Sequence, residues 1–81
     1  MEFYISRYAE KQRQQRGIPL EILEAVLQNP QQIVENKGKK IYQSQVEFED
    51  GIICLVRAVV SDLTRPAIVI TVYQTWQISR Y

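Results

Sequence analysis

The side chains best suited to chemistry in this sequence are arginine, lysine and tyrosine, since its 81 residues include no histidine and one cysteine. The missing histidine excludes histidine-dependent triads, histidine-based acid–base pairs and ordinary mononuclear zinc sites. The three glycines are too widely spaced for a phosphate-binding loop or a dinucleotide fingerprint. We therefore expect neither a metal nor a cofactor. Cys54, inside an apolar run, is expected to be a core residue.

Arg57 and Tyr73 are the candidates for a reaction centre, and the chemistry they suggest is cleavage of RNA. Arginine stabilises negative charge that develops at phosphorus, and tyrosine or lysine moves protons to and from the sugar hydroxyl and the leaving oxygen. Lys11 and Arg16 would complete this catalytic set from the N-terminal part of the chain. The alternative is structural: Arg57 pairs with Glu47 across two strands, and Tyr73 is a packed ring.

The net charge of +1 is too small for binding of nucleic acid by overall charge, so any anion site has to be local. Basic residues gather near the N-terminus and again around residue 38. An ordinary solvated helix face is the alternative for the N-terminal group. Besides the catalytic set, the residues expected to contact RNA are Arg7, Lys39, Lys40 and Thr71.

Two helices are predicted near the N-terminus, and they must position part of this set. The first, 7–16, begins after Ser6, a good N-cap, and its thin apolar side places it over the edge of the core. The side most able to pack carries Tyr8 and Ala9. The second, 19–28, has its apolar residues on one stripe and therefore packs on a sheet.

Four strands are predicted after the helices, at 31–36, 40–48, 52–60 and 67–73. The second of them alternates polar with apolar residues, and the last two are runs rich in valine and isoleucine. We expect the tail to plug the bottom of the core, with extension of the last strand as the alternative. Its apolar residues are Trp76, Ile78 and Tyr81.

The turn between the second and third strands decides which side chains share a face of the sheet. A two-residue turn at Asp50-Gly51 would place Phe48 on the same face as Arg57. A three-residue loop, 49–51, with glycine in the left-handed conformation keeps apolar residues with apolar residues. We adopt the three-residue loop.

Pairing of the last two strands around a turn near residues 62–64 then gives the sheet two unlike faces. One face is aliphatic and lies under the helices. The other mixes polar and apolar residues, which suggests a groove, a dimer contact or a partner surface. The expected pairs are Ala58 with Ile70, Val56 with Val72, Arg57 with Thr71 and Leu55 with Tyr73. The mixed face holds Gln43, Gln45, Glu47, Ile53, Leu55, Arg57, Val59, Val69, Thr71 and Tyr73.

Short motifs spread along most of the chain resemble a known family. They are Arg16-Gly17-Ile18, Gln28-Asn29-Pro30, the strand Val69-Ile70-Thr71-Val72-Tyr73 and the closing Ile78-Ser79-Arg80-Tyr81. Together they look like the small bacterial proteins of domain-of-unknown-function family 4258. The resemblance implies a RelE-like toxin fold, with two helices followed by a four-stranded antiparallel sheet. It also implies kinship to the ribonuclease toxins of toxin–antitoxin pairs, whose catalytic residues are basic and aromatic.

The chain departs from that family on the first helix, where members often carry a histidine before an alanine. Tyr8 precedes Ala9 at this place. If the histidine takes part in the chemistry, the reaction in this chain is altered or absent. Kinship of fold does not by itself establish an activity.

Sequence and resemblance together predict a single α+β domain over 1–81, with two N-terminal helices packed on a four-stranded antiparallel sheet. The leading hypothesis is a toxin-type, metal-independent endoribonuclease (mRNA interferase), with RNA or the ribosome as target and an antitoxin as partner. The alternative is a non-catalytic module that forms a homodimer or binds a protein through the mixed face. No signal-peptide pattern and no apolar run of ~20 residues is visible, so we expect a cytoplasmic protein without membrane contact.

Overall fold

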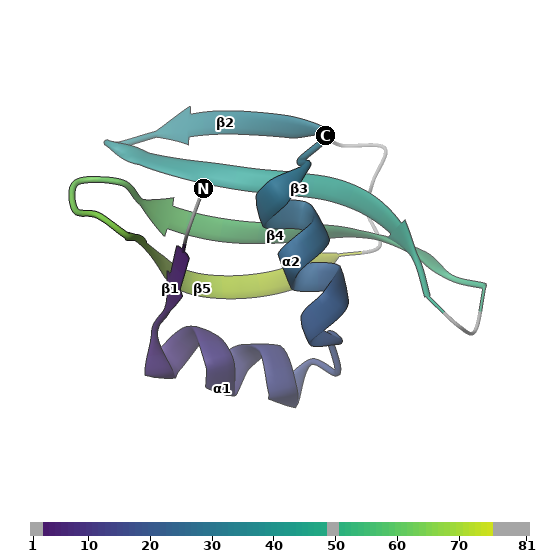
Figure 1. Cartoon of the computed structure of the whole chain (residues 1–81). Coiled ribbons are helices and arrows are strands. Elements are labelled where there is room, and N and C mark those ends of the chain that lie inside the picture. Colours follow the sequence, from purple (N-terminus) through teal and green to yellow (C-terminus); the bar gives the residue numbers. More distant parts are fainter. Residues whose placement is uncertain (1–2, 49–50, 76–81) are drawn as a thin grey trace.

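The computed structural model describes residues 3–48 and 51–75 of the chain, and the predicted α+β class is confirmed. The elements in chain order are β1 (Phe3–Ile5), α1 (Arg7–Gln15), α2 (Leu20–Gln28), β2 (Gln32–Asn36), β3 (Lys39–Glu47), β4 (Ile53–Ser61) and β5 (Ala67–Thr75) (Figure 1). The tail prediction rests on Trp76, Ile78 and Tyr81, which lie outside the described residues.

The predicted four-stranded antiparallel sheet of RelE-like form is wrong. The sheet has five strands in the order β1-β5-β4-β3-β2, and it is mixed because β1 runs parallel to β5. Strand β1 has three residues, and Phe3 pairs with Ala67 and Ile5 with Val69. Three residues are too few to show an alternation, so the sequence pattern gave no sign of this strand.

Two hairpins build the antiparallel part of the sheet. Lys37 and Gly38 join β2 to β3 with φ values of 54° and 79°, the left-handed pair typical of a two-residue hairpin turn. Between β3 and β4 the Phe48 N–H donates to the Ile52 carbonyl at 2.9 Å, and Gly51 has a φ of 81°. The register predicted with a three-residue loop is therefore confirmed, while residues 49 and 50 of that loop lie outside the described residues.

A β-bulge in β5 changes the pairing predicted for the last two strands. Val59 lies opposite Thr71 but Val60 lies opposite Val69, so Ile70 is the extra residue. Between Leu55 and Val59 the predicted pairs are wrong by two residues. The bulge accounts for one of them, and the pairing on the turn side, Val60 with Val69, already differs from the prediction by one. Arg57 lies opposite Tyr73 rather than Thr71. Val69, predicted on the mixed face, instead joins the core.

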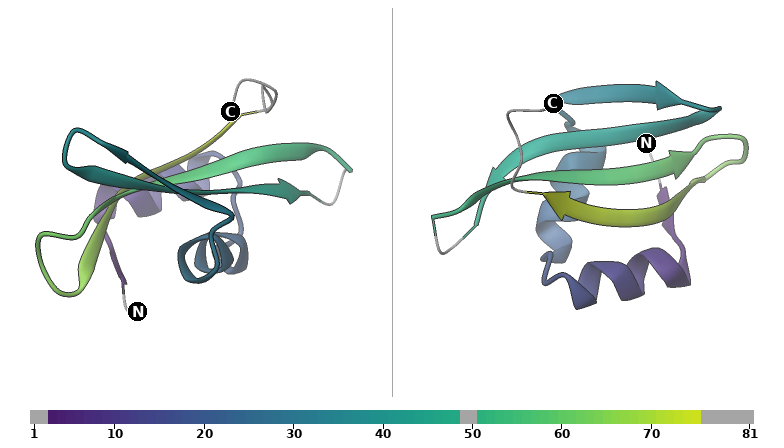
Figure 2. Two further views of the ribbon diagram at one scale, coloured as in Figure 1. Left: turned by 90° about the horizontal axis from the view of Figure 1, so that it is seen from above. Right: turned by 180° about the vertical axis from the view of Figure 1, so that it is seen from behind.

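Helix α2 packs across one face of the sheet, and α1 lies beside β5 along the edge of the core, as predicted (Figures 1 and 2). The buried core residues are Ala9, Ile18, Leu23, Val26, Leu27, Tyr42, Val56, Ala58, Val60, Ala67, Val69 and Val72. From α1 only Ala9 joins this cluster, while Tyr8 is 60% exposed and does not pack as predicted. Cys54 is buried, as expected.

Ser6 connects β1, α1 and the bulge. Its Oγ accepts a hydrogen bond from the Ala9 N–H at 3.1 Å, which caps α1 as predicted. The same hydroxyl donates to the Ile70 carbonyl at 3.2 Å, and the Ser6 N–H donates to the Val69 carbonyl at 3.1 Å. One residue thus fixes the start of the helix against the irregular part of β5.

Neither helix in the described part of the chain is long and apolar enough to cross a membrane.

Candidate functional site

Four polar side chains cross the sheet in a line, one from each of β2, β3, β4 and β5. Gln32 lies opposite Gln43, Gln43 opposite Arg57, and Arg57 opposite Tyr73. Their immediate neighbours Tyr42, Val56, Ala58 and Val72 belong to the core under α2. Since successive residues of a strand point to opposite faces, this line, the polar row, lies on the face away from α2.

Direct contacts hold the polar row together. The Arg57 Nε donates to the Gln43 Oε1 at 3.0 Å, and the Gln43 Nε2 donates to the Gln32 Oε1 at 2.8 Å. The guanidinium carbon of Arg57 lies 5.5 Å from the centre of the Tyr73 ring, within the range of a cation–π contact. Gln43 is 4% exposed and uses both ends of its amide, so the orientation of Arg57 is set by a buried group.

Apolar residues surround the row on the same face. Ile41 and Leu55 are buried, Val59 is half-buried, and Ile53 is 49% exposed. Arg57 and Tyr73 are themselves half-buried. The face is therefore mixed, as predicted, and its charged group is partly shielded from water, where electrostatic attraction is stronger than in bulk solvent.

The predicted alternative for Arg57, an ion pair with Glu47 across the strands, does not fit the strand register. Glu47 lies opposite Ile53, four residues from Arg57 along β4. That separation is roughly 13 Å along an extended strand. The side chain opposite Arg57 is the amide of Gln43, which orients the guanidinium.

The basic residues predicted on the first helix do not lie on its buried side. Ala9 marks the buried side of α1, and Lys11 and Arg7 are exposed at about 200° and 160° around the helix from it. Both therefore point outward from the sheet. Arg16 is the C-cap residue of α1, and its carbonyl accepts a hydrogen bond from the Gln74 Nε2 at 3.3 Å.

The remaining predicted RNA contacts lie on β3 and β5. Lys39 is exposed at the hairpin end of β3, and Lys40 forms an ion pair with Asp62 at 2.6 Å. Hydrogen bonding within this pair raises the pKa of Lys40 and lowers the pKa of Asp62. Thr71 is half-buried, opposite Val59 on the face of the polar row. The structure thus brings Arg57, Tyr73 and Thr71 onto one face.

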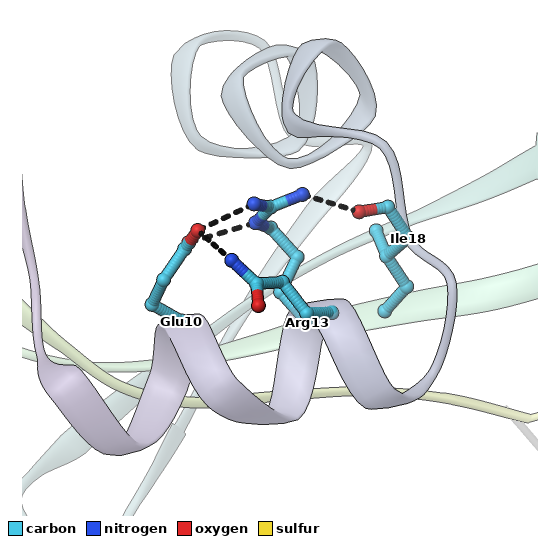
Figure 3. A network of polar contacts seen from close by, with 4 residues as sticks. Glu10, Arg13 and Ile18 are labelled. Carbon is cyan, nitrogen blue, oxygen red and sulfur yellow. Dashed lines mark hydrogen bonds and ion pairs between the residues drawn. The ribbon is translucent and has the colours of Figure 1, made fainter.

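A second arginine network, which the sequence interpretation missed, joins α1 to the segment before α2 (Figure 3). The Arg13 Nε and Nη2 donate to the two carboxylate oxygens of Glu10 at 2.8 and 2.5 Å, and the Nη1 donates to the Ile18 carbonyl at 2.9 Å. The hydrogen bond from Arg13 lowers the pKa of Glu10 from 4.5 to about 2. An acid and a base three residues apart on a helix were the available signal.

No metal centre is visible in the described ranges, 3–48 and 51–75. They hold no group of three or more histidine, cysteine, aspartate or glutamate side chains arranged to bind a metal ion. The polar row itself consists of two amides, a guanidinium and a phenol. These groups suit an anion and an aromatic base rather than a cation.

Comparison with known proteins gives one match. The family model described as Domain of unknown function (DUF4258) matches residues 5–74, a range that includes the whole polar row. No curated protein and no solved structure matches the chain.

Proposed function

Since the chain belongs to the DUF4258 family of domains of unknown function, its activity has to be inferred from its own site, and we propose a toxin-type endoribonuclease acting on RNA. Arg57 and Tyr73 are its reaction centre. The family resemblance noted in the sequence and the chemistry of the polar row support this proposal.

The observation that carries the proposal is the fixed guanidinium of Arg57. Gln43 holds its Nε at 3.0 Å, and the Tyr73 ring lies 5.5 Å from its carbon. A guanidinium that is oriented before the substrate arrives stabilises developing charge without reorganisation. The neighbouring ring offers a surface on which a base can stack. Both needs of a phosphodiester substrate are therefore met within one pair of strands.

In the proposed reaction the ribose 2′-oxygen forms a bond to the adjacent phosphorus, and the bond from phosphorus to the next 5′-oxygen breaks. The 2′-hydroxyl proton passes to water, and the Tyr73 hydroxyl donates its proton to the leaving 5′-oxygen. Tyr73 then recovers a proton from water. Arg57 neutralises the charge on the non-bridging oxygens. The products are a 2′,3′-cyclic phosphate and a 5′-hydroxyl end.

Cleavage of a labelled single-stranded RNA by purified protein tests this function. Arg57→Lys keeps the charge but loses the planar fork, and we expect about 100-fold slower cleavage. Tyr73→Phe keeps the ring, so cleavage should fall by about 100-fold while RNA affinity changes little.

The control is Arg65→Ala, which removes an exposed arginine from the β4–β5 turn and should leave cleavage unchanged. Expression of the protein in bacteria should arrest growth, and Arg57→Lys should relieve the arrest. Intact RNA after incubation with the folded wild-type protein would refute the proposed activity.

A protein-binding role is the second candidate, because Ile53 exposes 49% of its surface on the same face as the polar row. In this case a homodimer or a protein partner covers the mixed face. The molecular mass from light scattering over a dilution series discriminates between the protein-binding role and the ribonuclease. A dimer that persists at low concentration and dissociates on Ile53→Asp would favour this second function over the first.

A further inference from the structure

The outer edge of β1 is a candidate docking site that lies away from the polar row. β1 is the outermost strand of the sheet, and the Ser6 N–H donates to the Val69 carbonyl of β5. In a parallel ladder alternate residues direct their backbone groups to the same neighbour. Phe3 and Ile5 therefore direct their N–H and C=O groups away from β5, in the manner of an edge that accepts another strand.

A hollow adjoins this edge on the face that carries α2. Its volume is about 310 Å³. The lining residues are Phe3, Tyr4 and Ile5 from β1, Glu24, Leu27 and Gln28 from α2, and Pro66. The walls combine apolar and polar surface, and Glu24, an exposed residue, adds a carboxylate. The volume lies at the small end of ligand pockets, which begin at about 300 Å³, and suits one or two apolar side chains.

We propose that an extended segment of a protein partner adds to the outer edge of β1. The segment hydrogen-bonds to the backbone of Phe3 and Ile5, places an apolar side chain in the hollow and sets a lysine or arginine beside Glu24. An extended segment fits better than a helix, because a helix uses its backbone groups internally and has none for the strand edge.

A second copy of this chain is a poorer occupant of the hollow. Pairing of two β1 edges would bring the Phe3 and Ile5 side chains of each copy to the contact. These side chains already pack against their own core, and the Phe3 ring lies edge-on to Tyr42 with centroids 5.5 Å apart. They are not available to fill the hollow of a partner, so two β1 edges do not supply each other's apolar anchor.

The docking site and the polar row lie on opposite faces of the sheet. A partner at β1 would therefore not cover the face that carries Arg57. The partner and RNA would bind independently of each other. This inference does not rest on the proposed ribonuclease activity.

The test is nuclear magnetic resonance of the isotope-labelled protein with a panel of synthetic hexapeptides. Each peptide alternates threonine with one apolar residue, either leucine, isoleucine, valine or phenylalanine, and ends in two lysines or two glutamates. We expect saturable shifts and slowed hydrogen exchange at the Phe3 and Ile5 amides, with lysine peptides bound several-fold more tightly. Glu24→Lys should reverse this preference.

The matched control is Glu21→Lys, an exposed position one turn earlier on α2 that does not line the hollow. It should leave the preference unchanged. The proposal is overturned if no peptide of the panel shifts the Phe3 and Ile5 amides at millimolar concentration, or if these shifts follow protein concentration alone, which would identify a second copy as occupant.

Discussion

Arg13 and Arg57 are each held by a side-chain acceptor, and the acceptors differ in charge. Arg13 faces the Glu10 carboxylate, which neutralises it and ties α1 to the segment before α2. Arg57 donates to the neutral Gln43 amide, which positions the guanidinium. Arg13 thus joins two segments of the fold, whereas Arg57 belongs to the polar row.

The Glu10–Arg13 pair predicts a pH dependence of stability. Glu10 has a folded pKa of about 2, below its ordinary 4.5, so its contribution is complete above pH 4.5 and disappears as the pH falls toward 2. Glu10 is 38% exposed, so solvent screening limits the contribution to about 0.5–1 kcal/mol.

Urea unfolding of wild type and Glu10→Gln at several pH values measures this contribution. The variant should be less stable at pH 7, and the difference should shrink as the pH falls to 2. Glu35→Gln, an exposed change on β2, is the control for general acid effects. A difference that does not vary with pH would contradict the assignment.

At the scale of single residues, the sequence predicted that Arg57 and Tyr73 share a face of the sheet. It did not predict the side-chain contacts that hold Arg57 in place. Strand alternation was enough to place Arg57 with Tyr73. The contact of Gln32 with Gln43 depends on the register of a separate strand, which alternation does not determine. The side-chain bonds of Arg13 depend on rotamers and on the path of the chain after α1.

Among the elements, β5 is the one whose irregularity matters most to the site. The extra residue, Ile70, places Val69 and Val72 on the core side while Thr71 and Tyr73 stay on the face of the polar row. Without the bulge, the residues of β5 on one side of Ile70 would turn to the opposite faces of the sheet. Apolar residues would then leave the core, and polar ones would enter it. The bulge therefore lets one strand serve both the core and the site.

Ser6 predicts how strongly the bulge is anchored. Ser6→Ala removes both the helix cap and the hydrogen bond to the Ile70 carbonyl, and we expect a loss of about 1–2 kcal/mol in the free energy of unfolding. Ser6→Asp keeps the cap acceptor but has no proton to donate, so its loss should be smaller.

Chemical denaturation of the three proteins gives this ranking. Equal stability of wild type and Ser6→Ala would show that neither bond contributes. An aspartate variant less stable than the alanine variant would show that the helix cap is not the main contribution of Ser6 to the free energy of unfolding.

The helices, the long strands and the β3–β4 loop were predictable because each has a periodic pattern or a demanding turn residue. Strand β1 and the bulge have neither. The pairing of β1 joins residues that are distant along the chain, and a bulge is a change of register without a distinctive residue. Both belong to tertiary structure, where local patterns do not determine the outcome.

For the molecule as a whole, the net charge of +1 limits how RNA can be held. If Arg57 carries the main phosphate contact, one or two phosphates are neutralised. The logarithm of the binding constant should then fall with the logarithm of salt concentration with a slope of about −0.7 to −1.4.

Fluorescence anisotropy with a short labelled RNA at several salt concentrations measures this slope. Arg65→Ala, in the β4–β5 turn, should change it little, and Arg57→Ala should abolish most of the binding. A slope steeper than about −3 would instead indicate an interface spread over several basic residues.

The parallel pairing of β1 with β5 has a consequence for how the chain folds. Phe3 and Ile5 meet their β5 partners, Ala67 and Val69, only after more than 60 further residues have been synthesised, since the contact at Ser6 spans 64 residues. Closing so long a loop is slow, and sheets with distant pairings fold in milliseconds to seconds. We therefore expect β1 to join the sheet only after β5 has been synthesised.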